Sequence, residues 1–310
     1  MRIAVFGAGG IGGYLGARLA QAGDDVALIA RGPHLRAIQA HGLFGESPTG
    51  DFHLTPSIAT DRPEDVGIVD AVLLGVKAWD VRAAAVAIRP MIGATTGVLT
   101  LQNGVEASAE VAEVLGKDHV MVGVAMVRCL IAGPGRLRHV GSVDPNLILG
   151  EIDNRASERV EHIRAALAKV RVTVNVPENI QTWLWGKFAG AVALGGVGAV
   201  VHVPVGVWRQ IPQVRNMVER VAQEVVMVAW ARGVHPPEGI IDQMKGAIDV
   251  LPPVYMASMH ADIVGGRPSE LEYWNGAVVR LGREAGVATP LNEFIYHSLL
   301  PQERQAREQV

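Results

Sequence analysis

A glycine turn near the N-terminus is the pattern in this sequence that most directly indicates chemistry. A short apolar run at residues 3–6 leads into GAGGIG at 7–12, and a helix-compatible segment follows. Gly7 allows a sharp turn, Gly9 lets a pyrophosphate approach the backbone, and Gly12 lets the helix lie close to the strand. The free N–H groups of a helix N-terminus attract negative charge. The alternative is a glycine-rich turn that binds nothing. The residues that we predict to bind a dinucleotide here are Gly7, Gly9, Gly10, Ile11 and Gly12.

Arg31 is placed to choose between the two nicotinamide dinucleotides. It ends the second predicted strand, at 25–31, where an NAD enzyme usually carries an acidic residue for the ribose hydroxyls. A guanidinium there can form paired, charge-assisted hydrogen bonds with a 2′-phosphate. We therefore predict a preference for NADPH over NADH, and the alternative is an ordinary surface arginine.

Lys187 is an isolated charge in an apolar segment. Between Glu178 and Arg209 it is the only Lys, Arg, Asp or Glu. Lysine is rarely buried without a reason, and desolvation lowers the pKa of an ammonium group, which makes it a better proton donor near neutral pH. We predict that Lys187 is a general acid that protonates a carbonyl oxygen as hydride arrives. The alternative is a lysine whose ammonium reaches the surface along an apolar helix.

The segment 257–276 carries a candidate carboxylate partner. Ser269 and Glu272 fit the S-x-x-E capping box, which would give Glu272 a structural role. Glu270 would then be free to pair with Lys187 or to hold a substrate or ribose hydroxyl. The alternative is two ordinary acidic residues in the first turn of a helix.

Asn103 follows one predicted strand, and Lys77 ends another. Ligands of open α/β sheets bind outside the carboxyl ends of the strands, so we expect Asn103 to face the nicotinamide and Lys77 to lie at the same edge of the sheet. The alternatives are a turn asparagine before Gly104 and a solvated strand-end lysine. The ten histidines show no metal-ligand spacing, so we predict no metal site.

The elements that carry these residues change in kind near Pro177. Before it, strand and helix patterns alternate, and most strands are continuous apolar runs typical of a sheet covered on both faces. After it only helix patterns remain. We predict an α/β fold with a doubly wound domain at 1–177 and an all-helical domain at 178–310. The strands are expected at 2–7, 25–31, 71–77, 97–101, 119–126, 135–141, 146–151 and 170–176, and the helices at 11–22, 33–41, 81–92, 105–116, 156–169, 180–200, 206–232, 237–250, 270–285 and 291–305.

Three local expectations accompany this scheme. The strands at 135–141 and 146–151 are expected to form a hairpin, which would make the sheet mixed. The apolar run from Phe188 to Val201 is expected to be a buried helix, because it is shorter than a membrane span. The last ten residues are mostly polar, and we expect a frayed tail.

The composition bounds the function classes. A formal charge of −3 and a pI near 6.4 argue against nucleic-acid binding. A single cysteine, Cys129, fits a reducing compartment, and we expect no removable signal before the first strand. We therefore expect a cytoplasmic protein with a small-molecule partner and no nucleic-acid or membrane partner.

Together the motifs resemble the ketopantoate reductase (2-dehydropantoate 2-reductase) family over almost the whole chain. The resemblance implies an N-terminal Rossmann-type domain, a C-terminal helical domain and NADPH in the cleft between them. It also implies reduction of a 2-oxo acid to a 2-hydroxy acid, as in pantothenate biosynthesis. The motifs that carry it are the glycine turn with Arg31, VKAWDV with Lys77, LQNG with Asn103, GPGRLRHVG at 133–141, WGK with Lys187, and SMHAD to SELEYWNG at 258–276.

The resemblance also implies roles for single residues. Lys187 would be the general acid and Glu270 its partner. Asn103 would lie near the reacting carbonyl, Ser258 would contact the substrate, and Lys77 would position cofactor or substrate.

Three positions depart from the family pattern. Enzymes of the family that form pantoate usually carry asparagine where this chain has Ala191, Gly195 and Tyr255. We therefore expect a roomier and less polar site along 187–195 and leave open a larger or less polar ketone, oxo acid or imine. A regulatory protein that binds NADPH without turnover also stays open, as do an opine-dehydrogenase-like reaction, the stereochemistry and a homodimer.

Overall fold

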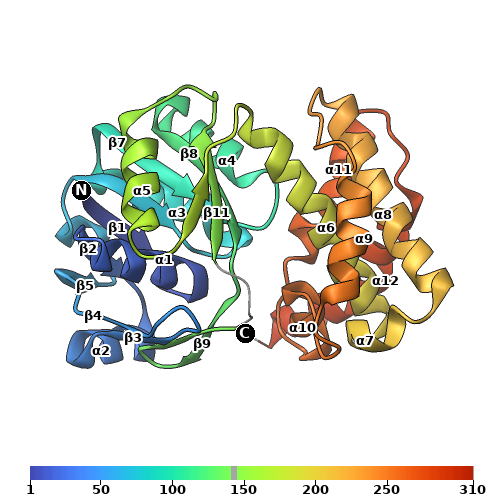
Figure 1. The fold of residues 1–310 in the computed structure, drawn as a ribbon, viewed down its shortest axis with the longest axis horizontal. Helices are drawn as coiled ribbons and strands as arrows, with labels where there is room; N and C mark the ends of the chain where they lie inside the picture. Colours follow the sequence, from blue (N-terminus) through green and yellow to red (C-terminus); the bar gives the residue numbers. More distant parts are fainter. Residues whose placement is uncertain (141–144, 310) are drawn as a thin grey trace. The chain divides into compact units, whose positions relative to one another are not determined.

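The computed structural model describes residues 1–140 and 145–309. Internal contacts divide these residues into two compact units. The first contains Met1–Gln102 and Glu106–Ile180, and the second contains Asn103–Val105 and the chain from Gln181 onward. Figure 1 shows that the first unit holds the strands and that the second is built of helices. The predicted fold class, a doubly wound α/β domain followed by a helical domain, is confirmed.

An eight-stranded sheet forms the centre of the first unit, in the order β12-β11-β8-β7-β6-β1-β2-β5. All neighbouring strands are parallel except β11 and β8, so the sheet is mixed, as predicted. The strand bounds are β1 (Arg2–Phe6), β2 (Asp25–Ile29), β5 (Ile58–Thr60), β6 (Val69–Leu74), β7 (Ile92–Thr100), β8 (Val120–Met126), β11 (Asn146–Glu151) and β12 (Thr173–Asn175).

Helices cover both faces of this sheet. In β1, Ile3 and Val5 pack in one apolar cluster with α1 (Gly10–Gln21) and α5 (Glu158–Ala168), while Ala4 and Phe6 pack in another with α3 (Val81–Ala87) and α4 (Ala107–Leu115). Both sides of β1 are thus buried. This is why the strands read as unbroken apolar runs.

A second, four-stranded sheet corrects the predicted hairpin. It has the order β4 (Phe52–Leu54), β3 (Leu43–Glu46), β10 (Arg136–His139) and β9 (Cys129–Gly133). β10 pairs with β9 and β3, whereas β11 belongs to the large sheet, so the expected hairpin of 135–141 with 146–151 is wrong. In β10 buried and exposed residues alternate, as expected for a sheet with one covered face. The expected turn falls mostly on 141–144, outside the described residues.

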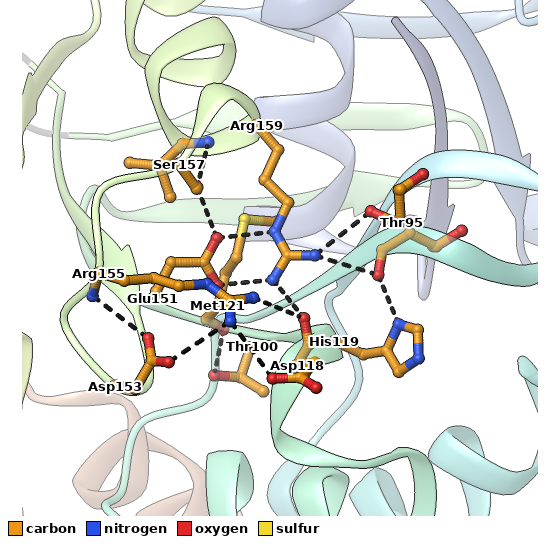
Figure 2. Close-up of polar contacts among 12 residues, drawn as sticks. Thr95, Thr100, Asp118, His119, Met121, Glu151, Asp153, Arg155, Ser157 and Arg159 are labelled. Carbon is orange, nitrogen blue, oxygen red and sulfur yellow. Dashed lines mark hydrogen bonds and ion pairs between the residues drawn. The ribbon is translucent and has the colours of Figure 1, made fainter.

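A buried ion pair ties the amino ends of β7 and β8 to β11 and α5 (Figure 2). The Glu151 carboxylate, 1% exposed, accepts hydrogen bonds from Arg159 Nη2 at 2.6 Å and Ser157 Oγ at 2.6 Å. The Arg159 guanidinium also donates to the carbonyl oxygens of Thr95 and Asp118. These contacts satisfy both buried charges. They lie at the end of the sheet opposite the glycine turn and hold the scaffold rather than a ligand.

The second unit packs around α6, whose residues Phe188, Val192 and Val197 are buried in its apolar core. α6 is long and apolar enough to cross a membrane, but 67% of its apolar window is buried against the rest of the protein, so this is weak evidence for a span. Its burial confirms the predicted core helix. The helices are α6 (Ile180–Val201), α7 (Val205–Trp208), α8 (Pro212–Ala231), α9 (Ile240–Val250), α10 (Ser258–Val264), α11 (Asn275–Glu284) and α12 (Pro290–Glu308).

The C-terminal residues correct a second expectation. α12 continues to Glu308, and both Glu303 and Ala306 are buried, so the predicted frayed tail is wrong. Leu299, Glu303 and Ala306 recur at helical spacing on the covered face of α12. Glu303 lies on that face because its carboxylate finds partners in the segment before α11.

Candidate active site

The glycine turn follows β1 directly. Gly7 has a φ of +91°, a conformation that favours glycine, and the N–H groups of Gly7 and Ala8 both donate to the Ile29 carbonyl. Gly9 then serves as the N-cap of α1, and no side chain caps this helix. The first-turn N–H groups of α1 therefore keep their capacity to bind an anion.

The space around the glycines separates those that the protein needs from one that it does not. A Cβ at Gly10 would lie 2.0 Å from the Cys129 carbonyl oxygen, and a Cβ at Gly12 would lie 2.5 Å from the Gly7 carbonyl oxygen. At Gly9, the only described atom within 4 Å would be Ile131 Cδ1, at an ordinary 3.8 Å, and φ is −79°. Packing thus accounts for Gly10 and Gly12, whereas no packing contact among the described residues requires a glycine at position 9.

Gly75 belongs to the same turn, and sequence reasoning missed it. A Cβ there would lie 2.5 Å from the Gly7 carbonyl oxygen and 2.9 Å from Gly12 Cα. Gln102 Nε2 donates to the carbonyl oxygens of Leu74 and Val76 and so holds the segment that carries Gly75. A glycine directly after the strand that pairs with β1 was the available signal.

His34 is a second missed residue of this region. Its Nδ1 accepts a hydrogen bond from the Gly135 N–H at 3.1 Å, so Nε2 carries the hydrogen and donates to the Ala8 carbonyl at 2.9 Å. His34 therefore links the glycine turn to α2 (Gly32–His41) and to the β9–β10 connection.

Arg31 is the N-cap residue of α2 and is exposed. Its side chain makes no hydrogen bond or ion pair with any residue that the structure describes. Lys77 is also exposed in the first unit, with its ammonium 5.6 Å from the centre of the Trp79 ring. Both cations are in the unit that carries the glycine turn.

Lys187 and Asn103 meet inside the second unit, to which residues 103–105 belong. Lys187 Nζ donates to Asn103 Oδ1 at 2.6 Å. An ammonium group only donates, so the amide must turn its oxygen toward it. The Asn103 carbonyl accepts a hydrogen bond from Trp274 Nε1 at 3.1 Å, which anchors this asparagine to the helical unit.

Glu270 is the charged group that acts on Lys187. Burial lowers the pKa of Lys187 from 10.5 to about 8, and the negative charge of Glu270 opposes that shift. The Glu270 side chain is only 5% exposed. Lys187 thus contacts Asn103 and is influenced by the charge of Glu270, and its lowered pKa brings release of a proton closer to neutral pH.

The predicted capping box is wrong. Ser269 Oγ accepts from the Leu271 N–H and donates to Glu303, while Glu272 accepts hydrogen bonds from Arg280 and Tyr296. Only a 3₁₀ turn, η5 (Leu271–Tyr273), follows Ser269, and α11 starts at Asn275. An S-x-x-E spacing caps a helix only where a helix begins at once.

At Gly195, one of the three positions that depart from the family pattern, the expected extra room is absent. A Cβ at Gly195 would lie 2.6 Å from the Trp274 ring, so the indole fills the space next to this glycine. Trp274 is 2% exposed, and no local sequence pattern predicts that its ring lies against Gly195. Ala191 and Tyr255 are half-buried, and Ser258 is exposed at the first position of α10. Among residues 1–140 and 145–309, no cluster of three His, Cys, Asp or Glu could hold a metal ion.

Comparisons with known proteins cover nearly the whole chain. Residues 3–154 match the family model "Ketopantoate reductase PanE/ApbA", and residues 179–303 match "Ketopantoate reductase PanE/ApbA C terminal". A 2-dehydropantoate 2-reductase of Mesorhizobium japonicum is 31% identical over 311 residues, which cover 94% of each chain.

Solved structures agree in fold. The PanE/ApbA family ketopantoate reductase from Ralstonia eutropha has a TM-score of 0.90 at 31% identity, covering 99% of this chain and 100% of that one. D-mandelate dehydrogenase with NADH and anilino(oxo)acetate has a TM-score of 0.88 at 24% identity, covering 99% of each chain. At that identity the second likeness extends to the fold alone.

Proposed function

The chain belongs to the ketopantoate reductase family, and we propose that it uses NADPH to reduce the carbonyl group of a 2-oxo acid to the hydroxyl of a 2-hydroxy acid. The observation that carries this proposal is the desolvated ammonium of Lys187, held by Asn103 and acted on by Glu270. Names of relatives make 2-dehydropantoate the first substrate to test. We also propose a cofactor domain at 1–177, a substrate domain at 178–310 and a cytoplasmic location.

The residues of the first unit fit a dinucleotide. The uncapped N–H groups at the start of α1 would bind the pyrophosphate, and the open space at Gly9 would let it approach. Arg31 would bind the 2′-phosphate, and Lys77 would help to position the cofactor or substrate. When bound, the reduced nicotinamide supplies the hydride.

Lys187 would supply the proton. Its Nζ–H would donate to the carbonyl oxygen, and the proton would pass to that oxygen as the carbon receives hydride, which leaves a neutral amine and a hydroxyl. Solvent would then return a proton to Lys187. Asn103 would fix one of the three ammonium hydrogens, and Glu270 would favour the protonated amine. Ser258 would contact the substrate.

The apolar surroundings of Gly195 support a second candidate for the substrate of the same reaction. The carbon skeleton of Trp274 fills the place next to this helix position, and Ala191 adds no polar atom one turn earlier. If a substituent of the substrate lay against Trp274 and Ala191, these residues would offer no hydrogen-bond partner for a hydroxyl group on it. A 2-oxo acid with an apolar substituent is therefore the second candidate.

A substrate panel tests the proposal. NADPH oxidation would be followed by absorbance with 2-dehydropantoate, with 2-oxoisovalerate, which lacks its hydroxymethyl group, and with the aromatic 2-oxo acid benzoylformate. We expect turnover with at least one of them and formation of the 2-hydroxy acid. Tight NADPH binding without turnover on any member would overturn the proposal and favour a regulatory NADPH-binding protein.

A further inference from the structure

The segment that carries Glu270 is held by the last turns of α12. The backbone N–H of Ser269 donates to both carboxylate oxygens of Glu303, at 3.1 and 3.0 Å, and Ser269 Oγ donates to Oε2 at 2.5 Å. Arg307 Nη2 donates to the Ser269 carbonyl oxygen at 2.9 Å. The N–H, hydroxyl and carbonyl groups of Ser269 are thus all hydrogen-bonded to Glu303 or Arg307 of α12. The hydroxyl also accepts a hydrogen bond from the Leu271 N–H.

This contact is buried and carries charge. Ser269 is 0% exposed and Glu303 is 4% exposed, and Arg307 Nε lies 2.7 Å from Glu303 Oε1. A buried carboxylate is expensive unless it is paired and hydrogen-bonded, and here it has both kinds of partner. Hydrogen bonds to a charged acceptor are also the stronger ones. The position of Ser269 is therefore closely fixed.

We propose that Glu303 is a positioning residue for the reaction: by holding Ser269 from α12, it fixes where the neighbouring Glu270 carboxylate lies relative to the Lys187 ammonium. The inference rests on the proposed function for its catalytic consequence. Glu303 itself does not contact Lys187 in the described structure, and it acts through one peptide unit. Small displacements of a catalytic group have large effects on rate, so this remote contact matters for turnover.

The variant Glu303→Gln tests the proposal. An amide cannot accept from Ser269 N–H, Ser269 Oγ–H and Arg307 Nε–H together, because one of its two atoms is a donor. We expect roughly tenfold lower kcat with an unchanged KM for NADPH. Lys187 must be protonated to act, and Glu270 keeps it protonated to higher pH. Losing that help moves the alkaline fall of kcat to lower pH, by about half a unit or more.

Glu224→Gln is the matched control. Glu224 is a buried carboxylate of α8 that accepts from the N–H groups of Leu291 and Asn292, so it holds the other end of the same helix. We expect it to lower the unfolding temperature as Glu303→Gln does, with kcat and its pH profile unchanged. The double variant Glu303→Gln with Ser269→Ala should lose no more kcat than Glu303→Gln alone, because both changes break one contact.

A readout without turnover separates this proposal from the proposed function. The chain has only the lysines Lys77, Lys117, Lys169, Lys187 and Lys245, so ¹³C-labelled lysine allows the Lys187 ammonium to be titrated by NMR. Its pKa should fall in Glu303→Gln and stay in place in Glu224→Gln, even if no 2-oxo acid is reduced. An unchanged Lys187 pKa in Glu303→Gln, or an equal shift in both variants, would overturn the positioning role.

Discussion

The glycine turn of the first unit depends on the packing of backbone atoms, whereas the Lys187 site of the second unit depends on contacts between side chains. The turn consists of backbone packed against backbone, where a Cβ at Gly12 would lie 2.5 Å from the Gly7 carbonyl oxygen. The Lys187 site consists of side chains: Nζ of the half-buried Lys187 lies 2.6 Å from Oδ1 of the half-buried Asn103, and the buried Glu270 supplies a charge that acts on the ammonium. Substitutions that add side-chain atoms should therefore disrupt the turn, whereas substitutions that remove side-chain atoms should disrupt the lysine site.

The largest expected effect is on the lysine site. Lys187→Ala removes the proton donor, and kcat should fall by roughly 10²- to 10⁴-fold. NADPH affinity should be nearly unchanged, because the turn lies in the other unit. Steady-state kinetics and NADPH fluorescence titration measure the two quantities. Lys245→Ala, which changes a partly exposed lysine of the same unit, should leave both unchanged, and near-normal turnover in Lys187→Ala would remove Lys187 from the mechanism.

An intermediate effect is expected at Arg31, because its side chain would bind the 2′-phosphate while the backbone of the glycine turn binds the pyrophosphate. Arg31→Ala should raise the KM for NADPH by about 10- to 100-fold, since a charge-assisted contact with the 2′-phosphate is lost. The KM for NADH should change little. Arg36→Ala, at an exposed position of the same helix, is the control. Equal changes for the two cofactors would contradict a role in recognising the 2′-phosphate.

The smallest effects come from a series of glycine-to-alanine changes. Gly195→Ala presses a methyl group onto the Trp274 ring and should cost about 1–3 kcal/mol in the free energy of unfolding. Gly190→Ala, on the same helix with only Met244 Cγ at 3.9 Å, should be neutral or stabilising. Gly12→Ala should cost the most, because a backbone carbonyl cannot turn aside. Urea unfolding measures all three, and equal stability of the Gly195 and Gly190 variants would contradict the packing argument.

The contrast between local backbone patterns and contacts of distant side chains also decides how much of the structure could be predicted from the sequence. The glycine turn and the doubly wound sheet follow from local spacing and from continuous apolar strands, and the lone charge at Lys187 is visible within one helix. The pairing of Ser269 with Glu303 joins positions 34 residues apart, so a local motif suggested Glu272 instead. The hairpin failed for a related reason, because β10 and β11 are adjacent in sequence but belong to different sheets.

The indole seated on Gly195 couples two positions of the chain. An asparagine at 195 cannot enter while Trp274 occupies that space, and Trp274 also donates to the carbonyl that anchors Asn103. Evolution or engineering that sought an amide at this point would have to change both residues together and replace the lost anchor. A scan of single substitutions would therefore find that position 195 does not tolerate asparagine, although the effect depends on which residue occupies position 274.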